Sequence, residues 1–330
     1  MFDESIPNEY RTHIVGGSKG TQIKYLKDNM WYKEDNLGCE GDIEYLVSII
    51  LRYSSLQESS YVVYEKGKIN NKNGCRSKDF TSNGGYVYYT LQRLYEQITG
   101  LDLYEKVKSI DGFEERRDFV LEFFNKYYKF DLFDYFSEIF TLDLITLNED
   151  RHFNNLGILL DVNSGEFCNA PIFDNGMSLL NGNVSVSRYK SIEENVRRVT
   201  SKPFSGSPLR QYNLFSHSFF LDYIGLFKEL NKVSIEDNFY KDVLCYQLLR
   251  YKDKFFKYEL LHLKHNEVLV GTRIQSCGNT YDVKKVYNKN VNNCVELRHI
   301  GNEYICDEGI STGVRIQEIP IDIIENLIDE

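Results

Sequence analysis

Residues 146–180 read TLNEDRHFNNLGILLDVNSGEFCNAPIFDNGMSLL and place Asp150 and Asp174 on either side of two apolar segments. We expect the two segments to form a hairpin with a loop at each end. Such a hairpin would return Asp174 to the end of the structure that carries Asp150 and Asn155. A group that orients a nucleophile and two oxygen ligands for Mg²⁺ are what a phosphoryl-transfer site requires.

Bulk composition narrows the class of protein. The chain has 330 residues and a formal net charge of −10 at pH 7. This length is sufficient for one large or two modest domains with a sizeable core. We expect no direct nucleic-acid binding, because the neutralisation of backbone phosphates needs a basic surface.

Cysteine usage and the chain start indicate the compartment. The seven cysteines are scattered singly, without a CxxC pair, so neither a zinc site nor a disulfide framework is expected. The first ten residues, MFDESIPNEY, are acidic and polar, unlike a signal peptide. No apolar run approaches the roughly 18 residues that span a bilayer. We therefore expect a cytoplasmic protein without a transmembrane segment, and secretion as an effector without a signal peptide stays open.

A glycine-rich sequence, GGSKGT, lies at 16–21 after a short predicted strand. Glycines allow backbone N–H groups to approach a phosphate closely, although an ordinary hairpin turn has the same composition. Predicted strands follow at 23–26 and 29–33, and the second ends at Lys33. A lysine in this position is either a ligand or a surface residue whose stem packs on the strand.

Apolar residues at helical spacing predict a helix over 39–53. Glu44 lies beside the apolar face of this helix, where it either reaches Lys33 or remains solvated. Strands and this one helix dominate up to residue 83, and helices dominate afterwards. The predicted later helices lie at 86–98, 101–108, 113–127 and 130–147, and a last helix is predicted at 321–328.

We expect three parts of the chain. Residues 1–83 would form a β-rich lobe, and residues 84–265 a larger helical lobe with the loops of Asp150 and Asp174. Residues 266–330 would form a β-rich appendage of unknown role. A long polar connection at 181–211 is of the kind that is usually functional or mobile.

The NEDRHFNN and FDNG sequences together resemble those of HipA-like kinases, whose DRHxxN motif is also similar to that of phosphatidylinositol 3- and 4-kinases. The resemblance covers residues 13–260 and includes the order of motifs from the glycine-rich turn to Asp-Asn-Gly. Lys202-Pro203-Phe204-Ser205 also resembles a segment that follows the metal-binding loop in this family. The resemblance implies an α+β, bilobal, protein-kinase-like fold.

The resemblance implies roles for the residues of the two acidic loops. Asp150 would orient or deprotonate the acceptor hydroxyl, and His152 would either help at the acceptor or brace the loop. Asn155 and Asp174 would bind Mg²⁺. Asn175 stands where many kinases have the phenylalanine of Asp-Phe-Gly.

The resemblance also implies a site for ATP. Lys33 would hold the α- and β-phosphates, and Glu44 would fix the position of Lys33. Gly17, Ser18 and Gly20 would cover the phosphates, although this loop does not have the GxGxxG spacing. A phosphate on Ser18 would occupy the space of the ATP phosphates, so autophosphorylation there is expected to inactivate the enzyme.

The leading hypothesis is therefore an ATP- and Mg²⁺-dependent kinase that phosphorylates serine or threonine in a protein substrate. A lipid or small-molecule kinase is an alternative, and a kinase-fold binding protein or toxin–antitoxin component is another. HipA-like proteins often act with a small antitoxin, so the resemblance also implies a small regulatory partner. Basic residues that would suit an anionic lipid headgroup lie in the polar connection: Arg188, Lys190, Arg197, Arg198, Lys202 and Arg210.

Overall fold

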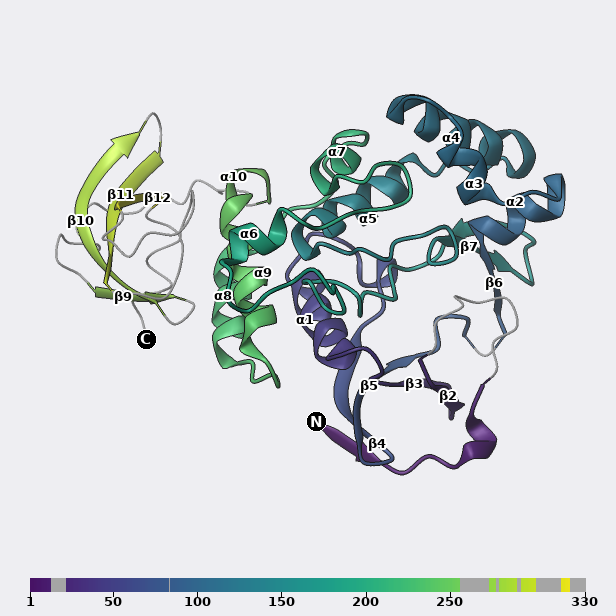
Figure 1. Ribbon diagram of the computed structural model, residues 1–330, viewed down its shortest axis with the longest axis horizontal. Helices are drawn as coiled ribbons and strands as arrows, with labels where there is room; N and C mark the ends of the chain where they lie inside the picture. The colour runs from purple at the N-terminus through teal and green to yellow at the C-terminus, as the bar shows by residue number, and fades with distance from the viewer. Residues whose placement is uncertain are drawn as a thin grey trace. The chain divides into compact units, whose positions relative to one another are not determined.

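The computed structural model describes residues 1–12, 22–82 and 84–255, and the backbone of four strands beyond them. The Cα atoms group into two compact units, which we describe separately. Unit 1 comprises Met1–Arg52, Leu56–Ser187 and Asn195–Phe219. Unit 2 comprises Tyr53–Ser55, Arg188–Glu194 and Phe220–Glu330. The protein has an α+β architecture (Figure 1), whereas the predicted lobe boundaries at residues 83 and 265 stay predictions.

A five-stranded sheet in unit 1 has the order β1-β4-β5-β3-β2. β1 pairs in parallel with β4, and the other pairs are antiparallel. The strands predicted at 23–26 and 29–33 are present, each displaced by one residue. The five strands are β1 (Phe2–Glu4), β2 (Lys24–Lys27), β3 (Met30–Glu34), β4 (Tyr64–Ile69) and β5 (Lys72–Lys78).

The two faces of this sheet have different partners. Cross-strand neighbours share a face, so the pairs Tyr25–Tyr32 and Lys24–Lys33 lie on opposite faces. The tyrosine face packs against the N-terminal segment in a cluster with Ile6. Helix α1 (Glu40–Arg52) packs on β4 and β5 (Figure 1), so the predicted helix at 39–53 is confirmed.

The predicted helix at 86–98 is wrong at its start. Tyr86–Thr90 forms strand β6, which pairs antiparallel with β7, and helix α2 runs over Leu91–Thr99. Consecutive β-branched and aromatic side chains favour a strand over the first turns. The hydroxyl of Thr90 then accepts a hydrogen bond of 3.1 Å from the backbone N–H of Arg93 and caps the helix.

The hairpin predicted between the two acidic loops is present. Strands β7 (Gly157–Asp161) and β8 (Phe167–Asn169) pair antiparallel. Asp161 Oδ1 accepts hydrogen bonds from the backbone N–H groups that begin the connecting turn. β8 is shorter than the apolar segment 167–173, so an irregular stretch leads from it to Asp174.

The helical part of unit 1 is built around α5 (Phe133–Thr146). Most of the residues of α5 are buried, including polar ones such as Thr141 and Asp143, so the helix is enclosed on nearly all sides. Its Phe136 and Phe140 rings contact a cluster that also contains Phe204 and Phe215. Other described helices of unit 1 are α3 (Leu103–Lys108), α4 (Phe113–Tyr128) and α7 (Pro208–Asn213), whereas α6 (Ile192–Val196) contains residues of both units.

Unit 2 combines helices with a separate sheet of order β12-β11-β10-β9. A helix predicted at 321–328 lies outside the described residues. The helices are α8 (Tyr223–Lys232), α9 (Asn238–Arg250) and α10 (Lys252–Phe255). The strands are β9 (Arg273–Ser276), β10 (Asn279–Lys289), β11 (Asn292–Ile300) and β12 (Ile316–Pro320).

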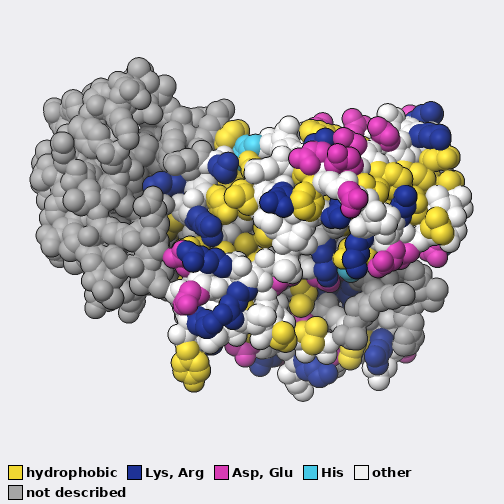
Figure 2. Space-filling model, turned by 45° about the horizontal axis from the view of Figure 1, so that its top comes forward, with side chains coloured by type: hydrophobic (Ala, Val, Ile, Leu, Met, Phe, Trp, Pro, Cys, Tyr) yellow, Lys and Arg dark blue, Asp and Glu magenta, His cyan; other side chains and the backbone are white. Residues whose placement is uncertain are grey.

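The described surface carries side chains of both charges. Figure 2 shows acidic, basic and apolar side chains interspersed over the described part of one face. None of the helices within the described ranges has the length and apolar character needed to cross a membrane.

Candidate active site

The loop that carries Asp150 follows the end of α5. Leu147 ends the helix in a left-handed conformation with φ 56°, and its N–H donates to the Asp143 carbonyl at 2.8 Å. The loop is closed by Asn155, whose Nδ2 donates to the carbonyl oxygen of Asp150 at 3.0 Å. The Asp150 side chain itself remains 44% exposed, so its carboxylate is accessible to a substrate.

Arg151 connects this loop to the loop that carries Asp174. Its fully buried guanidinium binds Asp143 of α5 through Nε and Nη2, at 3.0 and 2.9 Å. Nη1 donates to the carbonyl of Phe173 at 2.8 Å, and Nη2 to Asn175 Oδ1 at 2.6 Å. Arg151, which follows Asp150 in the chain, therefore binds the residues on both sides of Asp174 and holds the two loops together.

Lys33 lies at the centre of a buried ionic cluster. Its Nζ donates to Glu44 Oε1 at 3.0 Å, to Asp174 Oδ1 at 2.9 Å and to the Tyr64 hydroxyl at 3.1 Å. The Lys33 side chain is 8% exposed and that of Glu44 only 2%. The contact predicted between strand lysine and helix glutamate is thus present.

Glu44 joins the sheet to the second acidic loop. Besides accepting from Lys33, it accepts a hydrogen bond of 3.0 Å at Oε2 from the backbone N–H of Asn175. Both carboxylate oxygens therefore have charged or polar partners, as a buried carboxylate requires. Because Lys33 binds the Asp174 side chain and Asn175 follows Asp174 in the chain, Glu44 contacts both Lys33 and the loop that carries Asp174.

The electrostatics of the cluster favour its ionised form. Burial opposes charge on Lys33, but Asp174 and Glu44 outweigh it and raise the pKa of Lys33 well above its ordinary value. Burial likewise opposes charge on Asp174, but Lys33 and Lys24 hold its pKa well below the ordinary range. Asp174 also adopts a left-handed backbone conformation with φ 60°, which is uncommon for a residue other than glycine.

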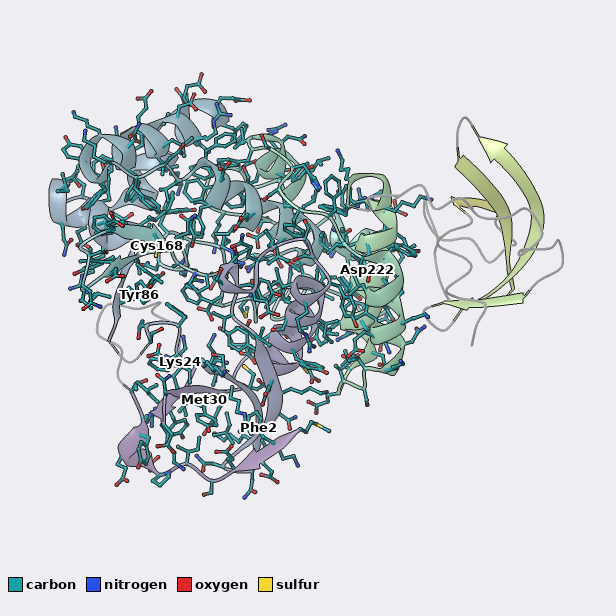
Figure 3. All side chains as sticks on the ribbon, turned by 180° about the vertical axis from the view of Figure 1, so that it is seen from behind. Phe2, Lys24, Met30, Tyr86, Cys168 and Asp222 are labelled. Carbon is teal, nitrogen blue, oxygen red and sulfur yellow. The ribbon has the colours of Figure 1, made fainter. Side chains whose placement is uncertain are left out.

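Lys24 is a further cation of this site that the sequence did not reveal. It pairs across the sheet with Lys33, so both side chains share the face that carries the ionic cluster. Burial lowers the pKa of Lys24, partly offset by the charge of Asp174. In Figure 3, Lys24 lies on the side of the sheet nearer Tyr86, and Phe2 on the other side. Its position depends on strand register, which single residues in the sequence do not indicate.

His152 contacts Asp150 from within the same loop. Its Nε2 lies 3.8 Å from Asp150 Oδ2, and its backbone N–H donates to the Asp150 carbonyl at 2.9 Å. The ring nitrogen Nδ1 is buried without a hydrogen-bond partner in the described part of the chain. These contacts fit either of the two predicted roles, at the acceptor or in bracing the loop.

Asn155 and Asp174 carry oxygen atoms that could bind a divalent cation. Asn155 Oδ1 is buried and accepts no hydrogen bond from the described residues, and the Asp174 carboxylate is held in its charged form. A neutral amide oxygen and a carboxylate are oxygen donors of the kind that Mg²⁺ prefers. No cluster of three or more His, Cys, Asp or Glu side chains able to hold a metal occurs in the described ranges. The donors present therefore suit a cation that is also bound by substrate phosphates, as Mg²⁺ often is.

Several predicted site residues are connected by direct contacts. Lys33 contacts both Glu44 and Asp174, and Asn155 contacts Asp150. The predicted residues of the glycine-rich loop lie outside the described ranges: Gly17, Ser18 and Gly20.

Comparisons with known proteins found distant likenesses among solved structures alone. No protein-family model matches the chain, and no curated protein matches it. Among solved structures, the chain is similar to the proinflammatory kinase CtkA of Helicobacter pylori, with a TM-score of 0.46 and 19% sequence identity. The similarity covers 71% of this chain and 90% of the other. A likeness this distant does not show the activity of this chain.

Proposed function

We propose that this protein is an ATP- and Mg²⁺-dependent kinase that phosphorylates serine or threonine side chains in a protein. The single observation that carries the proposal is the cluster in which Lys33 contacts Glu44 and Asp174. It combines an oriented ammonium, which can neutralise phosphate oxygens, with a carboxylate suited to a metal. Phosphoryl transfer depends mainly on such charge neutralisation and positioning.

The proposed roles follow from the chemistry of each side chain. The exposed carboxylate of Asp150 would orient the acceptor hydroxyl and receive its proton as the new oxygen–phosphorus bond forms. The bond from the γ-phosphorus to the leaving oxygen of ADP breaks in the same step. Lys33 would bind phosphate oxygens, and Glu44 would keep Lys33 in position. Asn155 and Asp174 would hold Mg²⁺, which when bound neutralises charge on the phosphates.

The sequence resemblance supports a HipA-like form of this activity. Under this proposal a small antitoxin-like regulator would bind the kinase, and Ser18, or alternatively Thr21, would be a site of autophosphorylation. Mass spectrometry after prolonged incubation with ATP tests the predicted autophosphorylation. An active enzyme that remains unmodified at both Ser18 and Thr21 would refute it.

A lipid or small-molecule alcohol is the second candidate acceptor. One observation favours it: the Lys202 ammonium lies 3.4 Å from the Asp150 carboxylate, where it could contact an anionic headgroup. Incubation with vesicles that contain phosphatidylinositol would separate the candidates. Labelled lipid without labelled protein would favour this second function.

The main experiment is a transfer assay with the purified protein, γ-labelled ATP and Mg²⁺. We expect label on the protein itself or on proteins of a cell lysate, and its loss in Asp150→Ala. Asp111→Asn changes an exposed acid away from these contacts and serves as the matched control. The kinase proposal fails if no acceptor is labelled, or if Asp150→Ala transfers label as fast as wild type.

A further inference from the structure

Lys202 contacts the side chain of Asp150 from a distant part of the chain. Its Nζ lies 3.4 Å from Asp150 Oδ1, and the two side chains are 39% and 44% exposed. Ion pairs with this exposure contribute little to folding stability, because water screens them and both side chains lose rotamer freedom. The position of Lys202 therefore requires an explanation other than stabilisation of the fold.

Buried hydrogen bonds fix the backbone around Lys202. Gln211 of α7 is 1% exposed, and its Nε2 donates to the carbonyl of Lys202 at 2.5 Å. The Gln211 Oε1 accepts from the N–H groups of Phe204 and Ser205, at 3.0 and 3.3 Å. Because three backbone groups within residues 202–205 bind the one buried amide of Gln211, the backbone at Lys202 is held in a defined position.

The same aromatic cluster anchors the loops of Lys202 and Asp150. The fully buried ring of Phe204 lies 5.8 Å from that of Phe153, which belongs to the Asp150 loop. Phe204 also packs against Phe136 of α5 at 5.5 Å. Packing of this kind keeps the side chains of a functional site, here Lys202 and Asp150, in a fixed position relative to each other.

A second connection lies one residue before Asp150. Glu149 Oε1 accepts a hydrogen bond of 3.0 Å from the backbone N–H of Thr200. Its Oε2 accepts one of 2.6 Å from Asn183 Nδ2. The segment that ends in Lys202 is therefore tied to the Asp150 loop by polar contacts as well as by the aromatic cluster.

We propose that Lys202 is a further catalytic residue, whose ammonium binds the phosphoryl group during its transfer and holds Asp150 toward the acceptor. This inference rests on the proposed kinase function. The acceptor oxygen bonds to the γ-phosphorus, the bond to the oxygen of ADP breaks, and the acceptor proton moves to Asp150. Lys202 remains protonated throughout and compensates the negative charge of the transferred group.

The test compares Lys202→Met, Lys202→Arg and Lys108→Met in steady-state assays. Lys108 is an exposed cation at the end of α3 and belongs to none of the proposed contacts, so it serves as the control. We expect Lys202→Met to lower kcat by about 10- to 100-fold, which corresponds to the loss of one charge-assisted contact. The KM for ATP should stay within about twofold, because the contact strengthens in the transition state. Lys202→Arg should recover part of kcat, and Lys108→Met should equal wild type.

A double variant separates a catalytic role from a structural one. If Lys202 acts together with Asp150, adding Lys202→Met to Asp150→Asn should slow transfer little beyond Asp150→Asn alone. Thermal unfolding and ATP binding of each variant establish that the loops remain folded. If Lys202→Met does not fold, Lys202→Arg and Lys202→Gln provide the same comparison.

Three results would overturn the inference. They are an unchanged kcat in Lys202→Met, a raised KM for ATP with unchanged kcat, or full additivity in the double variant. These failures are distinct from failure of the kinase proposal, in which the wild-type protein itself transfers no phosphoryl group.

Discussion

Arg151 donates a hydrogen bond of 2.6 Å to Asn175 Oδ1, and both side chains are buried. This bond joins the residue after Asp150 to the residue after Asp174. The two acidic loops are separated in sequence by the hairpin β7–β8, so their relation depends on this contact and on the contact of Arg151 with Phe173. The geometry of the candidate site therefore depends on a residue that touches neither substrate in the proposed reaction.

Arg151→Met should destabilise the protein strongly. The change leaves the buried carboxylate of Asp143 without its charged partner, which typically costs about 3–5 kcal/mol of unfolding free energy. Urea unfolding followed by circular dichroism measures the effect. Arg151→Lys should recover only part of it, because an ammonium cannot reproduce the forked contact with Asp143.

The control for this prediction is a double-mutant cycle. Asp143→Asn combined with Arg151→Met should destabilise by less than the sum of the single changes, since both remove the same ion pair. Strict additivity would show that the pair does not stabilise the site.

Lys24→Met should weaken nucleotide binding about tenfold, because it removes a cation from the face shared with Lys33. Methionine keeps the length and apolar character of the lysine stem. Titration calorimetry with ATP measures the change. Lys27→Met is the matched control, because Lys27 belongs to the same strand but lies on the opposite face of the sheet. Equal affinities in the two variants would contradict a role for Lys24.

Asn155→Ala should raise the Mg²⁺ concentration that gives half-maximal activity by at least about tenfold. Mutation of a residue that only hydrogen-bonds to a metal ligand typically lowers metal affinity about 10–100-fold. Asn155 is proposed to bind the ion directly, so its loss should cost at least as much. Activity is measured over a range of Mg²⁺ at saturating ATP. The adjacent, partly exposed Asn154 provides the control variant, Asn154→Ala. An unchanged Mg²⁺ requirement in Asn155→Ala would remove Asn155 from the proposed ligands.

Asp174 should make stability depend on pH in the acidic range. Its pKa in the folded state is depressed, so the unfolded state binds a proton first as the pH falls. The stabilisation that its charged form contributes is therefore complete above the unfolded pKa of about 3.9 and is lost progressively below it. Urea unfolding at several pH values should show a smaller acid loss for Asp174→Asn than for wild type. Identical pH dependence would contradict the depressed pKa.

Local pattern was sufficient to predict part of this structure. Lys33 ends an aromatic strand and Glu44 lies beside an apolar helix face, so both could be placed from their immediate sequence. The hairpin between the acidic loops followed from its two apolar segments in the same way. At Tyr86–Thr90 the pattern was ambiguous, and pairing with β7 selected a strand over the predicted helix.

Other parts of the site depend on long-range contacts that sequence spacing does not encode. Lys24 joins the site through the register of β2 against β3. Lys202 reaches Asp150 because an aromatic cluster brings two distant loops together. The importance of Arg151 follows from its complete burial, whereas its type and position alone would suit an exposed residue.

The central claim is that Asp150 acts on the acceptor while Lys33 binds the phosphates. It is tested most directly by single-turnover transfer from γ-labelled ATP, with purified wild type, Asp150→Asn, Lys33→Met and Asp111→Asn. Our account predicts that wild type and Asp111→Asn transfer label at equal rates. It also predicts that Asp150→Asn binds ATP normally but transfers at least about 100-fold more slowly, and that Lys33→Met loses ATP affinity. Transfer by Asp150→Asn at the wild-type rate would contradict the account.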